Sequence, residues 1–199
     1  MEAVREIVAR GVPLDRSDVD TDQIIPSDWL KRVERTGFGD GLFAEWRQRS
    51  DFVLNQDRYD GAAVLVAGPN FGTGSSREHA VWALQDYGFR AVISSRFADI
   101  FRNNALKGGL VPVVLPEPVV RTIMAAIDDD ASIEIVIDVV DRRVAIPAIA
   151  LDEPFALDDY TQHRLLEGLD DIGLTQALES MIAAFQVADR RRRPSIYST

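Results

Sequence analysis

An alternation of apolar runs and amphipathic segments constrains the fold more than any other feature of this sequence. Three runs rich in apolar residues are typical of buried strands, and they cover residues 62–68, 90–95 and 110–116. A segment with apolar side chains at helical spacing follows each run, over residues 76–88, 97–109 and 117–130. This β-α-β-α-β-α order predicts a parallel sheet with right-handed crossovers.

The sequence before this regular unit is less periodic. Residues 4–14 predict an opening strand or hairpin. A polar turn from Asp18 to Asp22 then leads into a short apolar stretch, after which Ser27 is placed to cap a short helix. Residues 31–42 combine glycines with basic side chains, which predicts a mobile loop.

The sequence after the regular unit changes period. Residues 132–148 alternate between apolar and polar side chains around a turn at 141–143, which predicts a β-hairpin. Residues 158–186 predict helix interrupted by glycines. Residues 187–199 contain the arginine run 190–193 and predict a frayed, solvated tail.

Composition excludes several classes of function. The net charge of −10, from 32 acidic and 22 basic residues, argues against nucleic acid as a partner, so an anion site must be built locally. The absence of cysteine excludes disulfides and thiolate metal sites within the chain, and two histidines are too few for a multi-histidine metal site. No apolar run predicts a signal peptide or a membrane span, so we expect a soluble cytoplasmic protein with no membrane partner.

The segment 68–79 carries the clearest sign of chemistry, because it joins a predicted buried strand to a predicted helix start. Open α/β sheets bind ligands at this edge, and the N–H groups at a helix start favour anions. Gly74 lets the backbone approach a ligand, and Ser75 and Ser76 supply two hydroxyls. The planar guanidinium of Arg77 matches a carboxylate bidentately.

Structural roles compete with this interpretation. Ser75 and Glu78 have the spacing of a capping box, in which Ser75 does no more than begin the helix. His79, in the first turn, fits a packing role as well as a catalytic one. The whole segment is also compatible with a carboxylate-binding module that carries out no reaction.

A dinucleotide site is a third possibility. Gly72 and Gly74 follow a strand and precede a helix, and Arg96 follows the next strand, where the 2′-phosphate of NADPH would lie. However, Arg77 stands where the fingerprint requires its third glycine. An NADPH-binding oxidoreductase domain is therefore an alternative with an incomplete motif.

These motifs also resemble a known family. The stretch Asn70 to Ala80, Asn-Phe-Gly-Thr-Gly-Ser-Ser-Arg-Glu-His-Ala, is similar to the motif of the swivelling domain of the aconitase superfamily. Three further stretches are similar to the small subunits of 3-isopropylmalate dehydratase, and they are residues 20–26, 36–43 and 168–175. The resemblance extends from about Gly11 to about Phe185. It implies one swivelling α/β domain over residues 1–199, with β/β/α layers, a mainly parallel sheet and a helical C-terminal segment.

The resemblance also implies an activity. The family isomerises 2-isopropylmalate to 3-isopropylmalate by dehydration and rehydration in leucine biosynthesis, and the small subunit is inactive alone. A separate large subunit is expected to carry a [4Fe–4S] cluster, and no cofactor is expected in this chain, in agreement with its lack of cysteine. Related members act on homoaconitate, citraconate or other substituted malates, so a hydro-lyase subunit for one of these dicarboxylates remains an alternative.

The resemblance assigns roles to the central motif. It implies that Ser75 is the base that removes a proton from carbon, and that Ser76 and Arg77 bind substrate carboxylates, with Gly74 beside them. An unperturbed serine hydroxyl is a poor base, so Ser75 would act as an alkoxide stabilised by helix-start N–H groups and Arg77. That role conflicts with Ser75 as an ordinary helix cap.

Four more residues complete the expected site. The resemblance marks residues 31–40 as a substrate-discriminating loop, in which Arg32 and Arg35 are candidates to contact the alkyl end or a carboxylate of the substrate. Thr21 and Asp22, from the Asp-Thr-Asp stretch, are also expected to contact substrate.

Overall fold

A computed structural model describes residues 1–31, 36–177 and 179–193, within which seven strands form one sheet in the order β4-β3-β2-β1-β5-β6-β7. The strands are β1 Glu6–Leu14, β2 Val64–Ala67, β3 Ala91–Ser94, β4 Val111–Val114, β5 Glu134–Asp138, β6 Arg143–Ile146 and β7 Leu151–Pro154. The α-helices are α1 Thr21–Ile24, α2 Glu78–Tyr87, α3 Asp99–Gly108, α4 Glu117–Asp129, α5 Asp159–Glu167, α6 Asp171–Ala177 and α7 Glu179–Arg192. Short 3₁₀ helices are η1 Ser27–Lys31, η2 Phe38–Gly41, η3 Trp46–Gln48, η4 Val53–Asn55, η5 Asp57–Tyr59 and η6 Pro147–Ile149.

Strand β1 joins two halves of the sheet that differ in strand direction. Its residues 11–14 pair in parallel with β2, whereas its residues 6–10 pair antiparallel with β5. Gly11 lies at the change, and a side chain there would come within 2.7 Å of Ile127 on α4 and 2.8 Å of Ile135 on β5. The sheet therefore curls tightly enough at β1 to bring α4 and β5 against the strand backbone.

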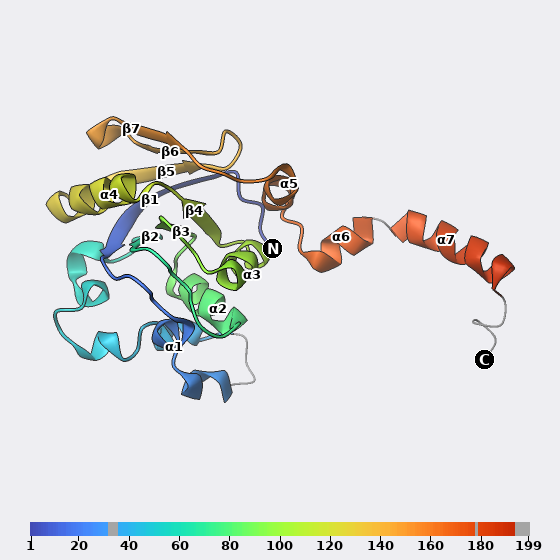
Figure 1. The fold of residues 1–199 in the computed structure, drawn as a ribbon, viewed down its shortest axis with the longest axis horizontal. Helices are drawn as coiled ribbons and strands as arrows, with labels where there is room; N and C mark the ends of the chain where they lie inside the picture. Colours follow the sequence, from blue (N-terminus) through green and yellow to red (C-terminus); the bar gives the residue numbers. More distant parts are fainter. Residues whose placement is uncertain (32–35, 178, 194–199) are drawn as a thin grey trace.

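The helices lie on both faces of the parallel half. Helix α4 contacts β1, β2 and β3, while α2 packs on α3, which in turn contacts β4. Figure 1 shows α4 between the two halves of the curled sheet, with α2 and α3 on the far side of the parallel strands. The predicted α/β class is confirmed, as are the parallel unit β2-α2-β3-α3-β4 and the antiparallel hairpin β5-β6.

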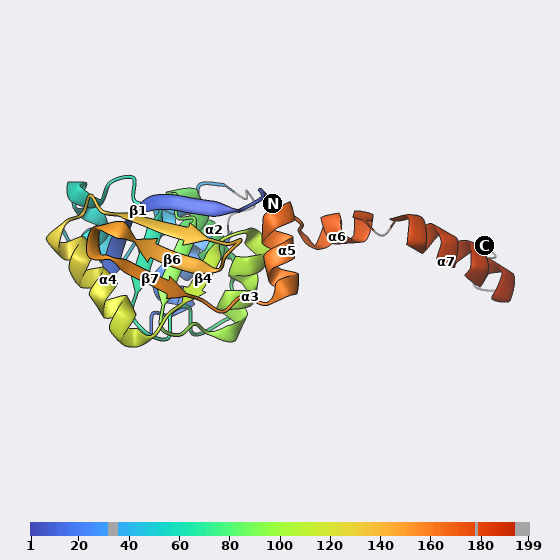
Figure 2. The same cartoon turned by 90° about the horizontal axis from the view of Figure 1, so that it is seen from above.

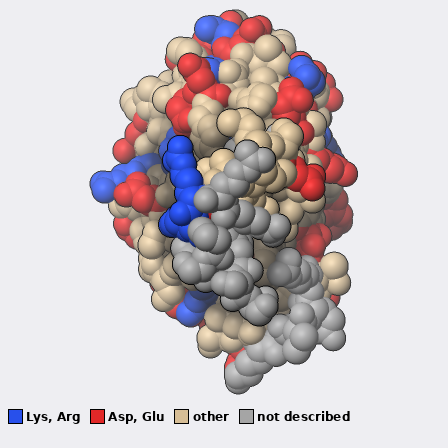
Figure 3. All heavy atoms as spheres, turned by 90° about the vertical axis from the view of Figure 1, so that its right-hand side faces the viewer, with Lys and Arg blue, Asp and Glu red and all other residues tan. Residues whose placement is uncertain are grey.

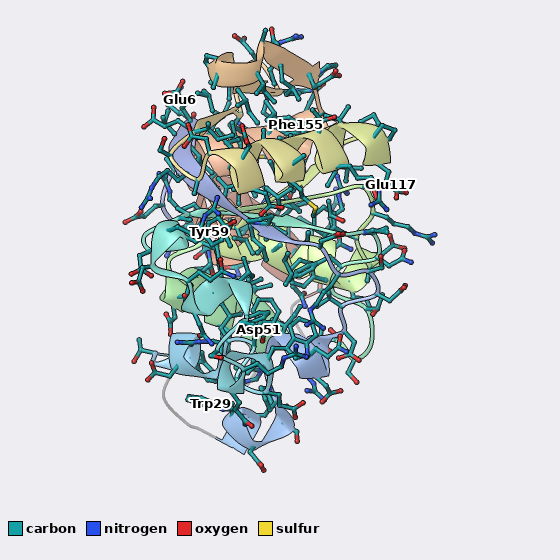
Figure 4. All side chains as sticks on the ribbon, turned by 90° about the vertical axis from the view of Figure 1, so that its left-hand side faces the viewer. Glu6, Trp29, Asp51, Tyr59, Glu117 and Phe155 are labelled. Atoms are coloured by element: carbon teal, nitrogen blue, oxygen red, sulfur yellow. The ribbon has the colours of Figure 1, made fainter. Side chains whose placement is uncertain are left out.

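Two features of the fold differ from the sequence prediction. Strand β7 pairs antiparallel with β6 and was not predicted. The segment predicted as a mobile loop contains η2, in which Phe38 is fully buried against α2. A side chain at Gly39 would lie 2.9 Å from the α2 backbone, and one at Gly41 would lie 2.5 Å from the Trp29 ring. These glycines therefore permit close packing. Figure 4 shows where Trp29 lies, at the end of the molecule opposite Phe155.

The predicted helical C-terminal segment is present as α5, α6 and α7. Figures 1 and 2 both show α6 and α7 extending away from the rest of the domain. Helix α7 continues to Arg192, beyond residue 187 where the tail was predicted to fray, and Arg193 forms an ion pair with Asp189 one turn earlier. In Figure 3, which views the side toward which these helices project, basic and acidic side chains are interspersed rather than forming a broad basic area.

Candidate active site

The candidate site is built from two loops that leave neighbouring parallel strands at the same edge of the sheet. Residues 15–20 follow β1 and residues 68–77 follow β2. The carbonyl of Val19 accepts hydrogen bonds from the backbone N–H groups of Gly72, at 2.7 Å, and Thr73, at 3.1 Å. The sheet thus places the Asp-Thr-Asp stretch directly beside the Gly-Ser-Ser-Arg stretch.

The central serines lie before the helix, not in it. Helix α2 begins at Glu78, and its N-cap residue is Arg77, whose side chain makes no capping hydrogen bond. Ser75 and Ser76 are exposed. The predicted capping box between Ser75 and Glu78 is therefore wrong, and the hydroxyl of Ser75 is not engaged in starting the helix.

A capping box does form, but on the neighbouring loop at the start of α1. The side chain of Asp20 accepts a hydrogen bond from the Gln23 N–H at 2.8 Å, while the Gln23 side chain accepts one from the Asp20 N–H at 3.0 Å. These reciprocal bonds satisfy two N–H groups and fix the start of the short helix. Sequence reasoning missed this cap, although Asp20 and Gln23 have the required spacing.

Thr21, the first residue of α1, connects this helix to the serine segment. Its backbone N–H donates to the Thr73 carbonyl at 2.8 Å, and its hydroxyl donates to the Ser75 carbonyl at 3.0 Å. Thr21 is only 2% exposed. Contact of Thr21 with substrate stays a prediction, and in this structure the Thr21 hydroxyl is buried and holds the backbone of Ser75. Gly74 lies against it, since a side chain there would meet the Thr21 hydroxyl at 3.4 Å.

Arg77 is oriented by α1. Its Nη1 lies 2.6 Å from Oδ1 of Asp22 and donates a longer hydrogen bond, 3.4 Å, to the carbonyl of Ile25. Both contacts use the same nitrogen, so no contact of Arg77 within the described chain uses its Nε–Nη2 edge. The carboxylate of Asp22 is thus engaged by Arg77 in this structure, and its predicted contact with substrate stays a prediction.

His79 has a packing role in this structure. Its ring lies 4.7 Å from the ring of Trp82 and 5.3 Å from that of Phe38, in tilted and edge-on geometries. Phe38 also donates its backbone N–H to Asp86 at 2.9 Å. These contacts tie η2 to α2 and account for a histidine in the first turn of α2 by its packing.

The geometry does not favour a dinucleotide site. Residues 68–77 separate the end of β2 from the start of α2, whereas the dinucleotide fingerprint needs a tight turn directly into the helix. A side chain at Gly72 would lie 2.2 Å from the Phe101 ring, so this glycine faces α3. Arg96 is exposed, and its backbone bonds to Phe71 and Ser94.

Two predicted substrate contacts, Arg32 and Arg35, lie outside the described residues. In the described chain there is no group of three or more His, Cys, Asp or Glu side chains suited to hold a metal ion. No helix in that part of the molecule is both long and apolar enough to cross a bilayer.

Comparison with known proteins identifies the family. Residues 1–118 match the family described as Aconitase C-terminal domain. The chain is 60% identical over 195 residues to the 3-isopropylmalate dehydratase small subunit of Frankia alni, covering 98% of this chain and 99% of that one. It is 58% identical over 194 residues to the protein of the same name from Thermobifida fusca, covering 98% and 97%. The chain belongs to the 3-isopropylmalate dehydratase small-subunit family.

A solved structure supports the same assignment. The crystal structure titled 3-isopropylmalate dehydratase (leuD) from Methanocaldococcus jannaschii superposes with a TM-score of 0.67 at 26% identity, covering 90% of this chain and 98% of that one. The family resemblance predicted from the motifs is thus confirmed. As a member of a hydro-lyase small-subunit family, the chain is an enzyme subunit, and neither the oxidoreductase nor the non-catalytic alternative is supported.

Proposed function

We propose that this chain supplies the proton-transfer half of a dehydratase site that converts 2-isopropylmalate to 3-isopropylmalate, in the leucine pathway of the cytoplasm. One observation carries the proposal. Ser75 is exposed outside the helix, on a backbone held by Thr21 and two residues before Arg77, whose guanidinium is oriented by Asp22. The activity for which the small-subunit relatives are named indicates the substrate.

The proposed reaction begins with removal of a proton from carbon. Ser75, as an alkoxide, takes the proton from the carbon next to the carbinol carbon, and the C–H electron pair forms a C=C bond as hydroxide leaves. The proton and the hydroxide together make the water that is lost. Re-addition of water with the hydroxyl on the other carbon gives the isomer.

Ser75 needs activation to act as a base, because an ordinary serine hydroxyl remains protonated near neutral pH. N–H groups at the start of α2 and the charge of Arg77 would stabilise the alkoxide in a site closed to water. In the isolated chain both Ser75 and Ser76 are exposed. This exposure supports a site that is completed when a large subunit covers the loops.

Substrate binding in this chain is assigned to two side chains of the motif. The Nε–Nη2 edge of Arg77 would take one carboxylate bidentately while Nη1 stays on Asp22. The hydroxyl of Ser76 would donate to the same or the second carboxylate. Arg32 and Arg35, in the loop 31–40, are proposed to distinguish the alkyl end of the substrate, and homoaconitate and citraconate are the competing substrates for the same site.

The [4Fe–4S] cluster expected for this reaction does not fit this chain, which has no cysteine to ligate it. We therefore assign the cluster, and the chemistry at the departing hydroxyl, to the large subunit. The residues of this chain bind the substrate and move the proton.

Reconstitution tests the proposal. The purified chain is mixed with a cluster-loaded large subunit, and the absorbance of the C=C bond is followed. It rises as isopropylmalate is dehydrated to isopropylmaleate, and it falls as homoaconitate or citraconate is hydrated. We expect turnover only with both subunits and the highest kcat/KM with isopropylmalate. Tight binding of NADPH by the chain, or equal turnover without it, would contradict the proposal.

A further inference from the structure

Two residues at the base of the site loops share an uncommon backbone conformation. Asp18 has φ 55° and Asn70 has φ 60°, both in the left-handed region. The two residues also bond to each other, because the Asn70 side-chain amide donates to Asp18 Oδ1 at 2.7 Å. The backbone N–H of Asp18 donates to the Pro69 carbonyl at 2.9 Å.

The residue types suit this arrangement. Asparagine and aspartate are the non-glycine residues that enter the left-handed region most readily. Their short side chains can also reach a neighbouring loop, which glycine cannot do. Asp18 and Asn70 therefore do two things: each adopts the left-handed conformation that its loop requires, and together they form a hydrogen bond between the loops.

The Asp18–Asn70 pair is the first of a series of hydrogen bonds between the two loops, and the last of the series is made to Ser75. Beyond it, the Val19 carbonyl bonds to Gly72 and Thr73, and then Thr21 bonds to Ser75. Because Ser75 precedes α2, these cross-loop bonds rather than helix geometry set its position. A shift of the Asp18–Asn70 pair would therefore move the Ser75 hydroxyl.

We propose that Asp18 and Asn70 are positioning residues for Ser75, which act through the loop backbones without touching substrate. The inference rests on the proposed function, since its readout is turnover by the assembled dehydratase. Asp18 is exposed, and the hydrogen bond that it accepts from the Asn70 side chain lies at the surface. This hydrogen bond therefore adds little to overall stability. Placement of a catalytic group is more demanding, because an error of about 1 Å can cost about a hundredfold in rate.

The test uses variants that keep the backbone conformation. Asn70→Gly and Asp18→Gly tolerate a positive φ but remove the bond between the side chains. The double variant Asp18→Asn/Asn70→Asp restores the bond in the reverse direction. In the complex with the large subunit, we expect each glycine variant to lower kcat about tenfold with KM nearly unchanged, and the exchanged pair to recover most of the kcat.

Controls separate positioning from general damage. Ala150→Gly changes another left-handed residue, φ 51°, in the antiparallel half and should leave kcat unchanged. Thermal unfolding and binding to the large subunit are measured for every variant. If a glycine variant does not fold, the exchanged pair alone decides, because it should keep most of the wild-type kcat.

Two results would overturn the inference, namely wild-type kcat in both glycine variants or a low kcat in the exchanged pair. Ser75→Ala is measured in the same assay. If Ser75→Ala retains turnover, the proposed base is wrong, which is a failure distinct from that of the positioning pair.

Discussion

Arg77 and Asp22 form an ion pair in which the arginine is the more buried partner, with 15% of its side chain exposed against 57% for the aspartate. Asp22 therefore holds the guanidinium from the solvent side through Nη1 alone. An ion pair with one exposed partner contributes little to stability, but here it fixes the direction of a long side chain. We therefore expect Asp22 to orient Arg77, and Arg77 to bind the substrate carboxylate.

Replacing Asp22 by asparagine tests this orienting role. Loss of the charge should weaken the hold on Arg77 by about 1 kcal/mol, which corresponds to about a fivefold rise in KM with kcat little changed. Steady-state kinetics of the assembled enzyme measure it. Glu6→Gln, which changes the net charge equally at the far end of β1, is the control, and an unchanged KM in Asp22→Asn would remove the orienting role.

Replacing Arg77 by lysine tests the bidentate contact. Lysine keeps the charge but cannot bind Asp22 and a substrate carboxylate through separate edges of one planar group. We expect KM to rise more than about tenfold, with a smaller fall in kcat. Equal KM values for the arginine and lysine enzymes would show that no bidentate contact is made.

Replacing Thr21 by valine tests the link to Ser75. The shape of the buried side chain is nearly kept, but the Ser75 carbonyl loses its donor. The free energy of unfolding should fall by about 1 kcal/mol, and kcat should fall severalfold because the base is less well placed. Thr21→Ser retains the hydroxyl and should retain kcat. If the valine and serine variants are equally active, the link has no catalytic importance.

Asp158 makes the stability of α5 depend on pH. Its carboxylate accepts a hydrogen bond from the Thr161 N–H at 2.9 Å, and this bond holds the pKa of Asp158 below its usual range. The stabilisation is present above the unfolded pKa, about 3.9, and is lost as pH falls through the lowered folded value. Asp158→Ala should lower the free energy of unfolding by about 1 kcal/mol at pH 7, with the difference shrinking below about pH 3.

Urea unfolding of the wild type and the Asp158 variants, at pH 7 and below about pH 3, checks this prediction. Asp158→Asn is the matched control, since asparagine caps without a titrating charge and should stay close to wild type at pH 7. A difference between wild type and Asp158→Ala that does not change with pH would contradict the charge-dependent part of the account.

Local sequence pattern predicts the strands and helices whose formation depends on neighbouring residues. The apolar run at 62–68 contains β2, and the helical segment predicted over 97–109 contains α3, which ends at a left-handed Gly109. Strand β7 was missed because Leu151–Pro154 has little β propensity, and its proline is tolerated only because the strand lies at the sheet edge.

The site needed tertiary information. Ser75 and Asp20 both carry capping-box spacing, yet only Asp20 forms one, because contacts with Thr21 hold the serine segment outside its helix. Those contacts join residues more than fifty positions apart, so no local pattern reveals them. The glycines at 39 and 41 suggest a mobile loop in the sequence, because the α2 backbone and the Trp29 ring that pack against them are not their sequence neighbours.

The central claim is that Ser75 is the base, and kcat of Ser75→Ala in the assembled enzyme tests it most directly. Complex formation is verified first, and Ser76→Ala is measured beside it as the binding-site control. We predict that Ser75→Ala lowers kcat by at least about a hundredfold while KM changes little, whereas Ser76→Ala mainly raises KM. A Ser75→Ala complex that forms fully and turns over at a near-wild-type rate would contradict the account.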